Sequence, residues 1–338
     1  MAEIRQNPIT KEWVIIATER AKRPDQFTSR KEKRILPAHD PACVFCPGNE
    51  HLTPGEVHRI PGADGNWQVR VVPNKFSALS PVGERTRRNE GFLKRTVSGV
   101  GIHDVIIETP EHNKTTGLLS AAEVEAVIRC YKQRYFTVTE DPRVELVTIF
   151  KNHGEAAGTS LEHPHSQLIA TPITSPQVRH RLEEALRWYD EFGECLFCQV
   201  LRSELEDEER IVVETDHFVS LVPYASLSPF HMWIFPRRHM ASFGEIQPVE
   251  MADLARNLQE TLARLYYGLD NPDFNYTIRT APSENRYVKY YHWYISLVPR
   301  LTRMAGFEIG SGFFINPTIP EKDAEFLREV KLPIPKAA

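Results

Sequence analysis

The sequence contains no hydrophobic run near the roughly 20 residues that a membrane-spanning helix requires. Its first segment, Met1 to Gln6, lacks the apolar core of a signal peptide. A formal net charge of −4 gives no excess of positive charge that would attract nucleic acid or an anionic membrane. We therefore expect a cytoplasmic protein that has neither a nucleic acid nor a membrane as a partner.

Cysteine is also scarce, with five residues in a chain of 338. Five thiols in a chain of this length do not make the disulfide framework of a small secreted domain. Four of them form two CxxC pairs, and in a reducing compartment such pairs bind metal or perform redox chemistry. The fifth, Cys130, falls in a predicted helix and is interpreted as a buried structural thiol.

The chain does contain a loop of small and polar residues at 152–167, which connects predicted strands at 144–150 and 168–170. Alternate residues of a strand point to the same face, so His163, His165 and Gln167 are expected to converge. An imidazole there can attack phosphorus or bind a metal, and an amide can donate to a phosphate oxygen. The alternative is a pair of solvated histidines at the end of a loop.

Landmarks of the first half recur in the second. His163 follows His112 by 51 positions, and His292 follows His239 by 53. In each half the CxxC pair precedes these histidines and a predicted strand. This agreement predicts an internal duplication. We place the boundary between halves of residues 1–172 and 173–338.

Each half therefore offers the two cysteines and two histidines that commonly hold a structural zinc ion in a closed tetrahedron. The predicted ligands are Cys43, Cys46, His112 and His163 in the first half, and Cys195, Cys198, His239 and His292 in the second. A redox function for the CxxC pairs is the alternative, which needs a CxxC at the start of a helix after a strand and does not depend on histidines.

The pattern N-x-G-x-x-x-G-x-S-x-x-H-P-H-x-Q at 152–167 resembles the active-site loop of the galactose-1-phosphate uridylyltransferase family, in the histidine-triad superfamily. The resemblance implies an α+β fold of two tandem histidine-triad-like halves, each an antiparallel sheet with packed helices. It implies that His165 is the nucleophile, which takes a nucleoside monophosphate from a nucleotide sugar and passes it to a hexose 1-phosphate in a ping-pong reaction. Gln167 and Ser160 would stabilise the phosphate charge. Tyr294 occupies the matching position of the second half, so we expect only the first half to be catalytic.

The resemblance also assigns substrate and metal contacts. It implies that the first Cys2His2 set binds zinc, and that the second does so in the branch that includes plant ADP-glucose phosphorylase. It implies a homodimer whose sites are completed by the partner chain. The residues that it places at the nucleotide sugar are Arg20, Arg23, Asn74, Asn152, Gly158, Arg303, Phe307 and Glu308.

The predicted function is transfer of UMP from UDP-glucose to galactose 1-phosphate. One alternative is transfer of AMP to phosphate, as an ADP-glucose or dinucleoside-polyphosphate phosphorylase would perform. Another is a non-catalytic, zinc-stabilised nucleotide-binding protein. A histidine-triad hydrolase fits less well, because those enzymes usually carry a third histidine where this chain has Gln167.

Overall fold

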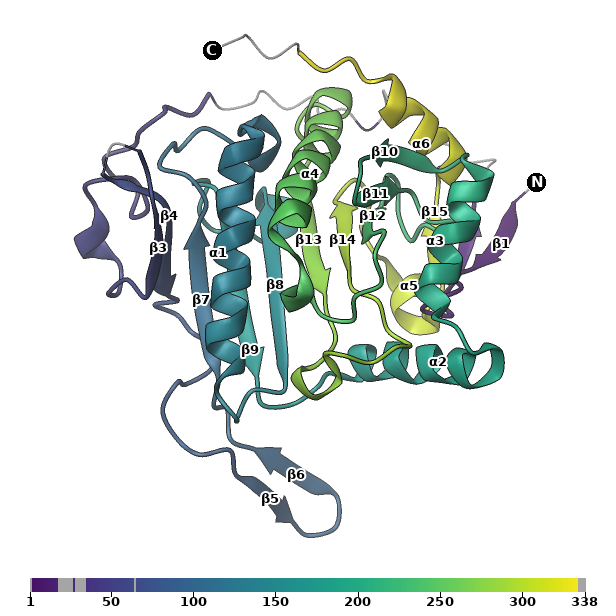
Figure 1. Ribbon diagram of the computed structural model, residues 1–338, viewed down its shortest axis with the longest axis horizontal. Helices are drawn as coiled ribbons and strands as arrows, with labels where there is room; N and C mark the ends of the chain where they lie inside the picture. Colours follow the sequence, from purple (N-terminus) through teal and green to yellow (C-terminus); the bar gives the residue numbers. More distant parts are fainter. Residues whose placement is uncertain (1, 18–26, 28–34, 64, 334–338) are drawn as a thin grey trace.

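The computed structural model describes residues 2–17, 27, 35–63 and 65–333, so the predicted Arg20 and Arg23 lie outside the described residues. The chain has the expected α+β fold, built on a ten-stranded antiparallel sheet (Figure 1). Its strands are β3 (His58–Pro61), β4 (Trp67–Pro73), β7 (Ile102–Ile107), β8 (Leu146–His153), β9 (His165–Thr171), β10 (Ile211–Glu214), β11 (Phe218–Leu221), β12 (Met232–Pro236), β13 (Phe274–Arg279) and β14 (Tyr294–Pro299).

The sheet consists of two groups of five strands with the same internal order. From one edge the order is β3-β4-β7-β9-β8, and from the other edge it is β10-β11-β12-β14-β13. The groups meet where β8 and β13 pair antiparallel, with Phe150 opposite Thr277. An approximate twofold axis therefore passes between these strands, and the halves share one continuous sheet. The boundary after residue 172 stays a prediction.

Two long helices, α1 (Ala121–Thr139) and α4 (Pro248–Gly268), lie side by side across one face of the sheet (Figure 1). Helix α1 begins at a capping box, in which Ser120 accepts from the Glu123 amide and the Glu123 carboxylate accepts from the Ser120 amide. Apolar side chains of both helices form one core with the strands beneath them, including Val127, Leu258 and Leu168.

The opposite face of the sheet is covered differently in the two halves. In the second half, α2 (Pro176–Phe192) and α3 (Leu196–Asp207) cover it, and Phe197 packs with Trp233, Phe235 and Tyr294. In the first half, the segment around Cys43 and Cys46 covers Ile107 of β7. The loop at 152–161 lies beside that segment.

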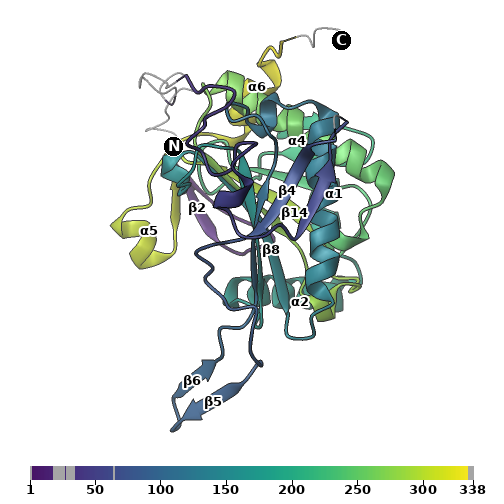
Figure 2. The same ribbon diagram turned by 90° about the vertical axis from the view of Figure 1, so that its left-hand side faces the viewer.

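Most of the remaining elements are peripheral. The hairpin β5–β6 projects from the body in both views, whereas β1, β2 and β15 form a small separate sheet (Figures 1 and 2). No helix of the described residues is long and apolar enough to cross a membrane. The peripheral strands and helix are β1 (Glu3–Gln6), β2 (Trp13–Ile16), β5 (Arg87–Glu90), β6 (Lys94–Val97), β15 (Phe314–Asn316) and α5 (Gly306–Ser311). Helix α6 (Pro320–Glu329) packs against α4 and β10 and places Leu327 in the main core. The short 3₁₀ helices are Glu50–Leu52, Thr116–Leu118, Glu155–Ala157, Phe243–Glu245 and Ser283–Asn285.

Candidate active site and metal centres

His165 is the first residue of β9, and its ring lies against Phe45 on the sheet face opposite α1. Its neighbour Ser166 points the other way, where its hydroxyl lies 2.7 Å from that of Tyr131 of α1. The His165 Nδ1 lies 2.8 Å from the carbonyl oxygen of His163, and because a carbonyl can only accept, Nδ1 carries the proton. Burial lowers the pKa of His165. The ring is therefore neutral with a free lone pair on Nε2, which is the form required of a nucleophile.

A buried ion pair supports the strand from the α1 side. The Lys151 ammonium donates to Glu108 at 2.6 Å and to the carbonyl oxygen of His165 at 3.3 Å. Tyr131 donates to the other oxygen of Glu108 at 3.0 Å and lies 2.6 Å from the hydroxyl of Tyr276. Since Tyr276 belongs to the second half, this network fixes the backbone at His165 to both halves of the sheet.

The loop before His165 borders an open cavity of about 250 Å³. Its walls are Leu36 and residues 151–155 and 159–165 of the first half, and Asn271 and Asp273 of the second. Asn152 lines it and accepts from Asn275 at 2.7 Å. Ser160 also lines it and is exposed, whereas the predicted Gly158 lies in the same loop outside the cavity lining.

Gln167 is held in one orientation by a residue that the sequence did not single out. His103 of β7 accepts from the Ala78 amide through Nδ1, so its Nε2 carries the proton and donates to Gln167 Oε1 at 2.8 Å. The amide nitrogen of Gln167 is thereby left to donate to a ligand. The predicted Asn74 lies beside this pair, with Nδ2 3.0 Å from His103 Nε2.

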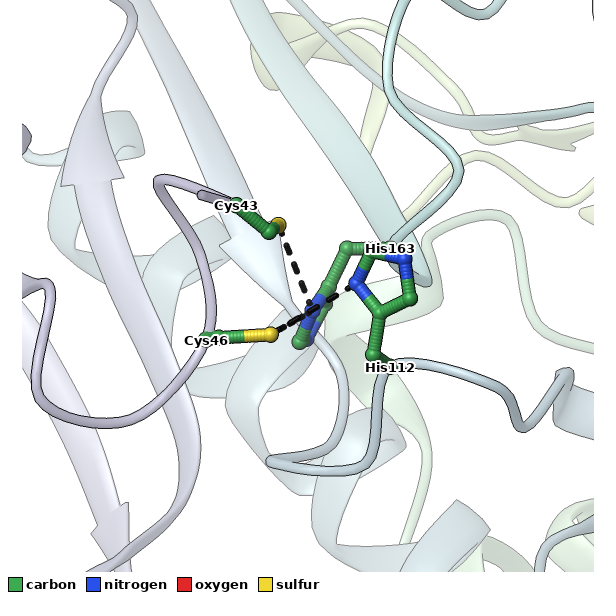
Figure 3. Close-up of side chains that lie close together, drawn as sticks. All are labelled: Cys43, Cys46, His112 and His163. Carbon is green, nitrogen blue, oxygen red and sulfur yellow. Dashed lines mark hydrogen bonds between the residues drawn. The ribbon is translucent and has the colours of Figure 1, made fainter. Parts of the chain in front are cut away.

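The first predicted set of metal ligands is brought together by the fold (Figure 3). The Sγ of Cys46 lies 3.5 Å from Nδ1 of His112 and 3.6 Å from Nδ1 of His163. Bonds of about 2.3 Å to sulfur and about 2.0 Å to nitrogen in a tetrahedron place such atoms about 3.6 Å apart. The Nε2 of His163 donates to the carbonyl of Thr109 at 2.8 Å, which leaves Nδ1 as the ligand atom. Burial raises the pKa of the Cys46 thiol to about 11, so a bound cation is needed to keep it as a thiolate at neutral pH.

The second predicted set is assembled in the same way. The Sγ of Cys198 lies 3.3 Å from Nδ1 of His239 and 3.4 Å from Nδ1 of His292. Cys195 is the N-cap of α3, the location that the redox alternative required. All four ligand atoms lie within 4.8 Å of one another, as in the first set, and this convergence fits a metal. Both sets can therefore hold an ion.

Three residues predicted to contact substrate do not line this cavity. Arg303 precedes α5, which contains Phe307 and Glu308, and this short helix stands out from the body (Figure 2). Phe307 is 50% exposed, and Glu308 accepts from the backbone amide of Ala305 at 3.0 Å. None of the three lines the cavity beside His165.

Comparison with known proteins agrees with this geometry over almost the whole chain. Residues 1–174 match the profile for the N-terminal domain of galactose-1-phosphate uridyl transferase, and residues 179–333 match that for its C-terminal domain. The chain belongs to this family. It is thus a nucleotidyltransferase of the galactose-1-phosphate uridylyltransferase type.

Individual relatives include two kinds of enzyme. The chain is 35% identical to ADP-glucose phosphorylase of Arabidopsis thaliana over 98% of its own length and 93% of the relative's. It is 30% identical to galactose-1-phosphate uridylyltransferase of Thermotoga maritima, over 99% and 100% of the two chains. A crystal structure of the Arabidopsis ADP-glucose phosphorylase with bound ADP-glucose superposes with a TM-score of 0.83, at 32% identity, over 98% and 100% of the chains.

Proposed function

We propose that this protein transfers a nucleoside monophosphate from a nucleotide sugar to a sugar phosphate through a covalent intermediate on His165. The observation that carries the proposal is the free Nε2 lone pair of a neutral, buried imidazole at the wall of the loop cavity. We propose UDP-glucose as the donor and galactose 1-phosphate as the acceptor.

In the first step, His165 Nε2 forms a bond to the α-phosphorus while the bond from that phosphorus to the sugar 1-phosphate oxygen breaks. The departing sugar 1-phosphate needs no proton, because its oxygen is weakly basic. The acceptor phosphate then attacks the same phosphorus and releases Nε2. The Gln167 amide, oriented by His103, donates to a non-bridging oxygen, and Ser160 and the amides of the loop assist it.

We assign zinc to both metal centres. A closed set of four protein ligands leaves no open position for water, so each ion organises structure. In the first centre, His163 holds the backbone whose carbonyl oxygen fixes the tautomer of His165. The remaining predicted contacts, Arg20, Arg23, Asn74, Asn152 and Gly158, belong to the nucleotide side of this proposal.

We further propose that the protein acts as a homodimer in the cytoplasm. Arg303, Phe307 and Glu308 do not line the cavity of their own chain, and the helix that carries two of them stands out from the body. A second copy can receive this helix, so that the three residues complete the partner's site.

A second function is favoured by one specific observation, the similarity to a protein named ADP-glucose phosphorylase at 35% identity. In that reaction the donor would be ADP-glucose, and the acceptor would be inorganic phosphate. Both reactions would pass through a nucleotidyl adduct on His165. The nucleotide in the adduct, UMP or AMP, and the acceptor that removes it therefore distinguish the two functions.

Intact-protein mass spectrometry after separate incubation with UDP-glucose and ADP-glucose tests the proposal, with a quench that avoids acid because the phosphoramidate is acid-labile. We expect a UMP adduct that galactose 1-phosphate removes, that is absent in His165→Ala, and that persists in the matched variant His58→Ala, whose ring contacts Gln133 at the surface. An AMP adduct cleared by inorganic phosphate would establish the phosphorylase function instead. Absence of any adduct would overturn the covalent mechanism.

A further inference from the structure

The second half contains a buried cluster of cationic and hydrogen-bond-donating side chains at the place where the first half has its nucleophile. Tyr294 is the first residue of β14, as His165 is the first residue of β9. Arg279 of β13 is paired opposite Tyr294 in the sheet. Helix α2 packs over these strands and brings Arg181 to them. The diverged half thus has two guanidinium groups around its counterpart of the catalytic position.

Arg181, Arg279 and Tyr291 line a small cavity of about 20 Å³. Arg181 is 7% exposed, and neither its Nε nor its Nη2 has a hydrogen-bond partner. Tyr291 is fully buried, and its hydroxyl lies against the Arg181 guanidinium. The two unsatisfied guanidinium donors are costly, because each has lost its hydrogen bonds to water. The wall of the cavity is therefore polar and rich in donors.

The positive charge in this region is only partly compensated. Glu12 attracts both guanidinium groups, and it lies with Arg181 in an adjoining open hollow. Burial and the neighbouring Arg181 guanidinium lower the pKa of Arg279. Two like charges in a buried space repel each other, and an anion between them would offset this repulsion.

We propose that this cavity is a binding site for a monoatomic anion, which is chloride in physiological solution. About 10–15 Å³ of such space holds one water molecule, so the cavity has room for one small ion at most and is too small for phosphate. Chloride accepts hydrogen bonds from every donor around it and neutralises the guanidinium pair. It bridges Arg181 of α2 and Arg279 of β13, and thereby stabilises the packing of α2 on the sheet of the second half.

Thermal unfolding of the full, zinc-loaded chain tests the site. The midpoint is measured in sodium chloride and in sodium gluconate at the same ionic strength. We expect a saturable rise of roughly 2 °C when chloride is tenfold above its dissociation constant. Arg279→Gln should lose this rise, whereas Arg179→Gln, an exposed arginine on the same helix as Arg181, should keep it. Tyr291→Phe, which removes one donor and keeps the ring, should weaken chloride binding if Arg279→Gln does not fold.

Crystals soaked in sodium bromide give a direct test. A bromide peak in anomalous difference maps within hydrogen-bonding distance of Arg181 and Tyr291 would support the site. No bromide peak there, together with equal midpoints in chloride and gluconate, would show that the cavity holds water and would overturn the proposal. A rise in midpoint with phosphate but not with chloride would overturn the assignment to a monoatomic anion.

Discussion

The two nitrogens of His103 have different partners, and this fixes the orientation of Gln167. His103→Phe keeps a ring of similar size but removes the donor to Gln167 Oε1, so the Gln167 amide can rotate away from the phosphate. We expect kcat to fall about 10- to 100-fold, with a smaller change in KM, because the contact matters most as charge develops in the transition state. Steady-state kinetics with each donor measures both constants. An unchanged kcat would show that His103 does not position Gln167.

Gly154 and Gly158 form a matched pair in the loop beside the cavity. Both have positive φ, +84° and +87°, which costs an L-residue about 1–2 kcal/mol. A Cβ on Gly154 would also lie 1.9 Å from Asp273 Oδ1, whereas a Cβ on Gly158 would have no atom within 4 Å. We expect Gly154→Ala to lower the free energy of unfolding clearly more than Gly158→Ala, as measured by urea denaturation. Equal losses would show that backbone strain alone accounts for both.

At the scale of elements, local signals were readable from the sequence and pairings between distant segments were not. The capping box of Ser120 and Glu123, which starts α1, is visible in the sequence because its hydrogen bonds join residues three apart. The role of His103 depends on the register between β7 and β9, which places Val105 opposite Gln167. The joining of both halves into one sheet through β8 and β13 was missed because edge pairing uses backbone groups that every sequence has. Helix α3 is not among the predicted elements, since its CxxC pair is interpreted as a pair of metal ligands with a redox function as the alternative.

Helix α6 is attached to the core by an acidic side chain whose ionisation opposes folding. Asp323 is buried, with Oδ2 accepting from the Phe230 amide at 2.9 Å and from Thr318 at 2.6 Å. Burial raises the pKa of Asp323 to about 7, whereas an unfolded aspartate has a pKa of about 3.9. Between these values the folded state binds more protons than the unfolded state, so this contribution to stability decreases as pH rises from about 4 to 7.

Asp323→Asn mimics the protonated form at every pH and should remove this dependence. We expect the variant to gain stability relative to the parent protein as pH rises through that window. Urea midpoints of both proteins between pH 4 and 8 provide the measurement, and the comparison cancels the titration of the metal ligands, which both proteins share. A constant difference across the window would show that Asp323 is ionised in the folded protein throughout.

At the scale of the whole molecule, the two metal centres lie in different halves of one sheet. The halves share the β8–β13 pairing, the contact between α1 and α4, and the bond between Tyr131 and Tyr276. Loss of a structural ion removes binding free energy that contributes directly to folding. Since the core is continuous across the junction, a loss in one half should destabilise both.

Cys198→Ser removes a ligand of the second centre and tests this coupling. Pulsed hydrogen exchange at increasing denaturant reports the unfolding of β4 in the first half and of β12 in the second, each followed by its own peptides. Unfolding of the second half alone would expose the β8 edge and the inner surface of α1, and would leave the first half without much of its core. We therefore expect both strands to unfold at one common, lowered midpoint. Cys46→Ser is the reciprocal variant and should lower the midpoint of β12 as well. If β4 kept its original midpoint in Cys198→Ser, the halves would be independent folding units that merely pair at their edges.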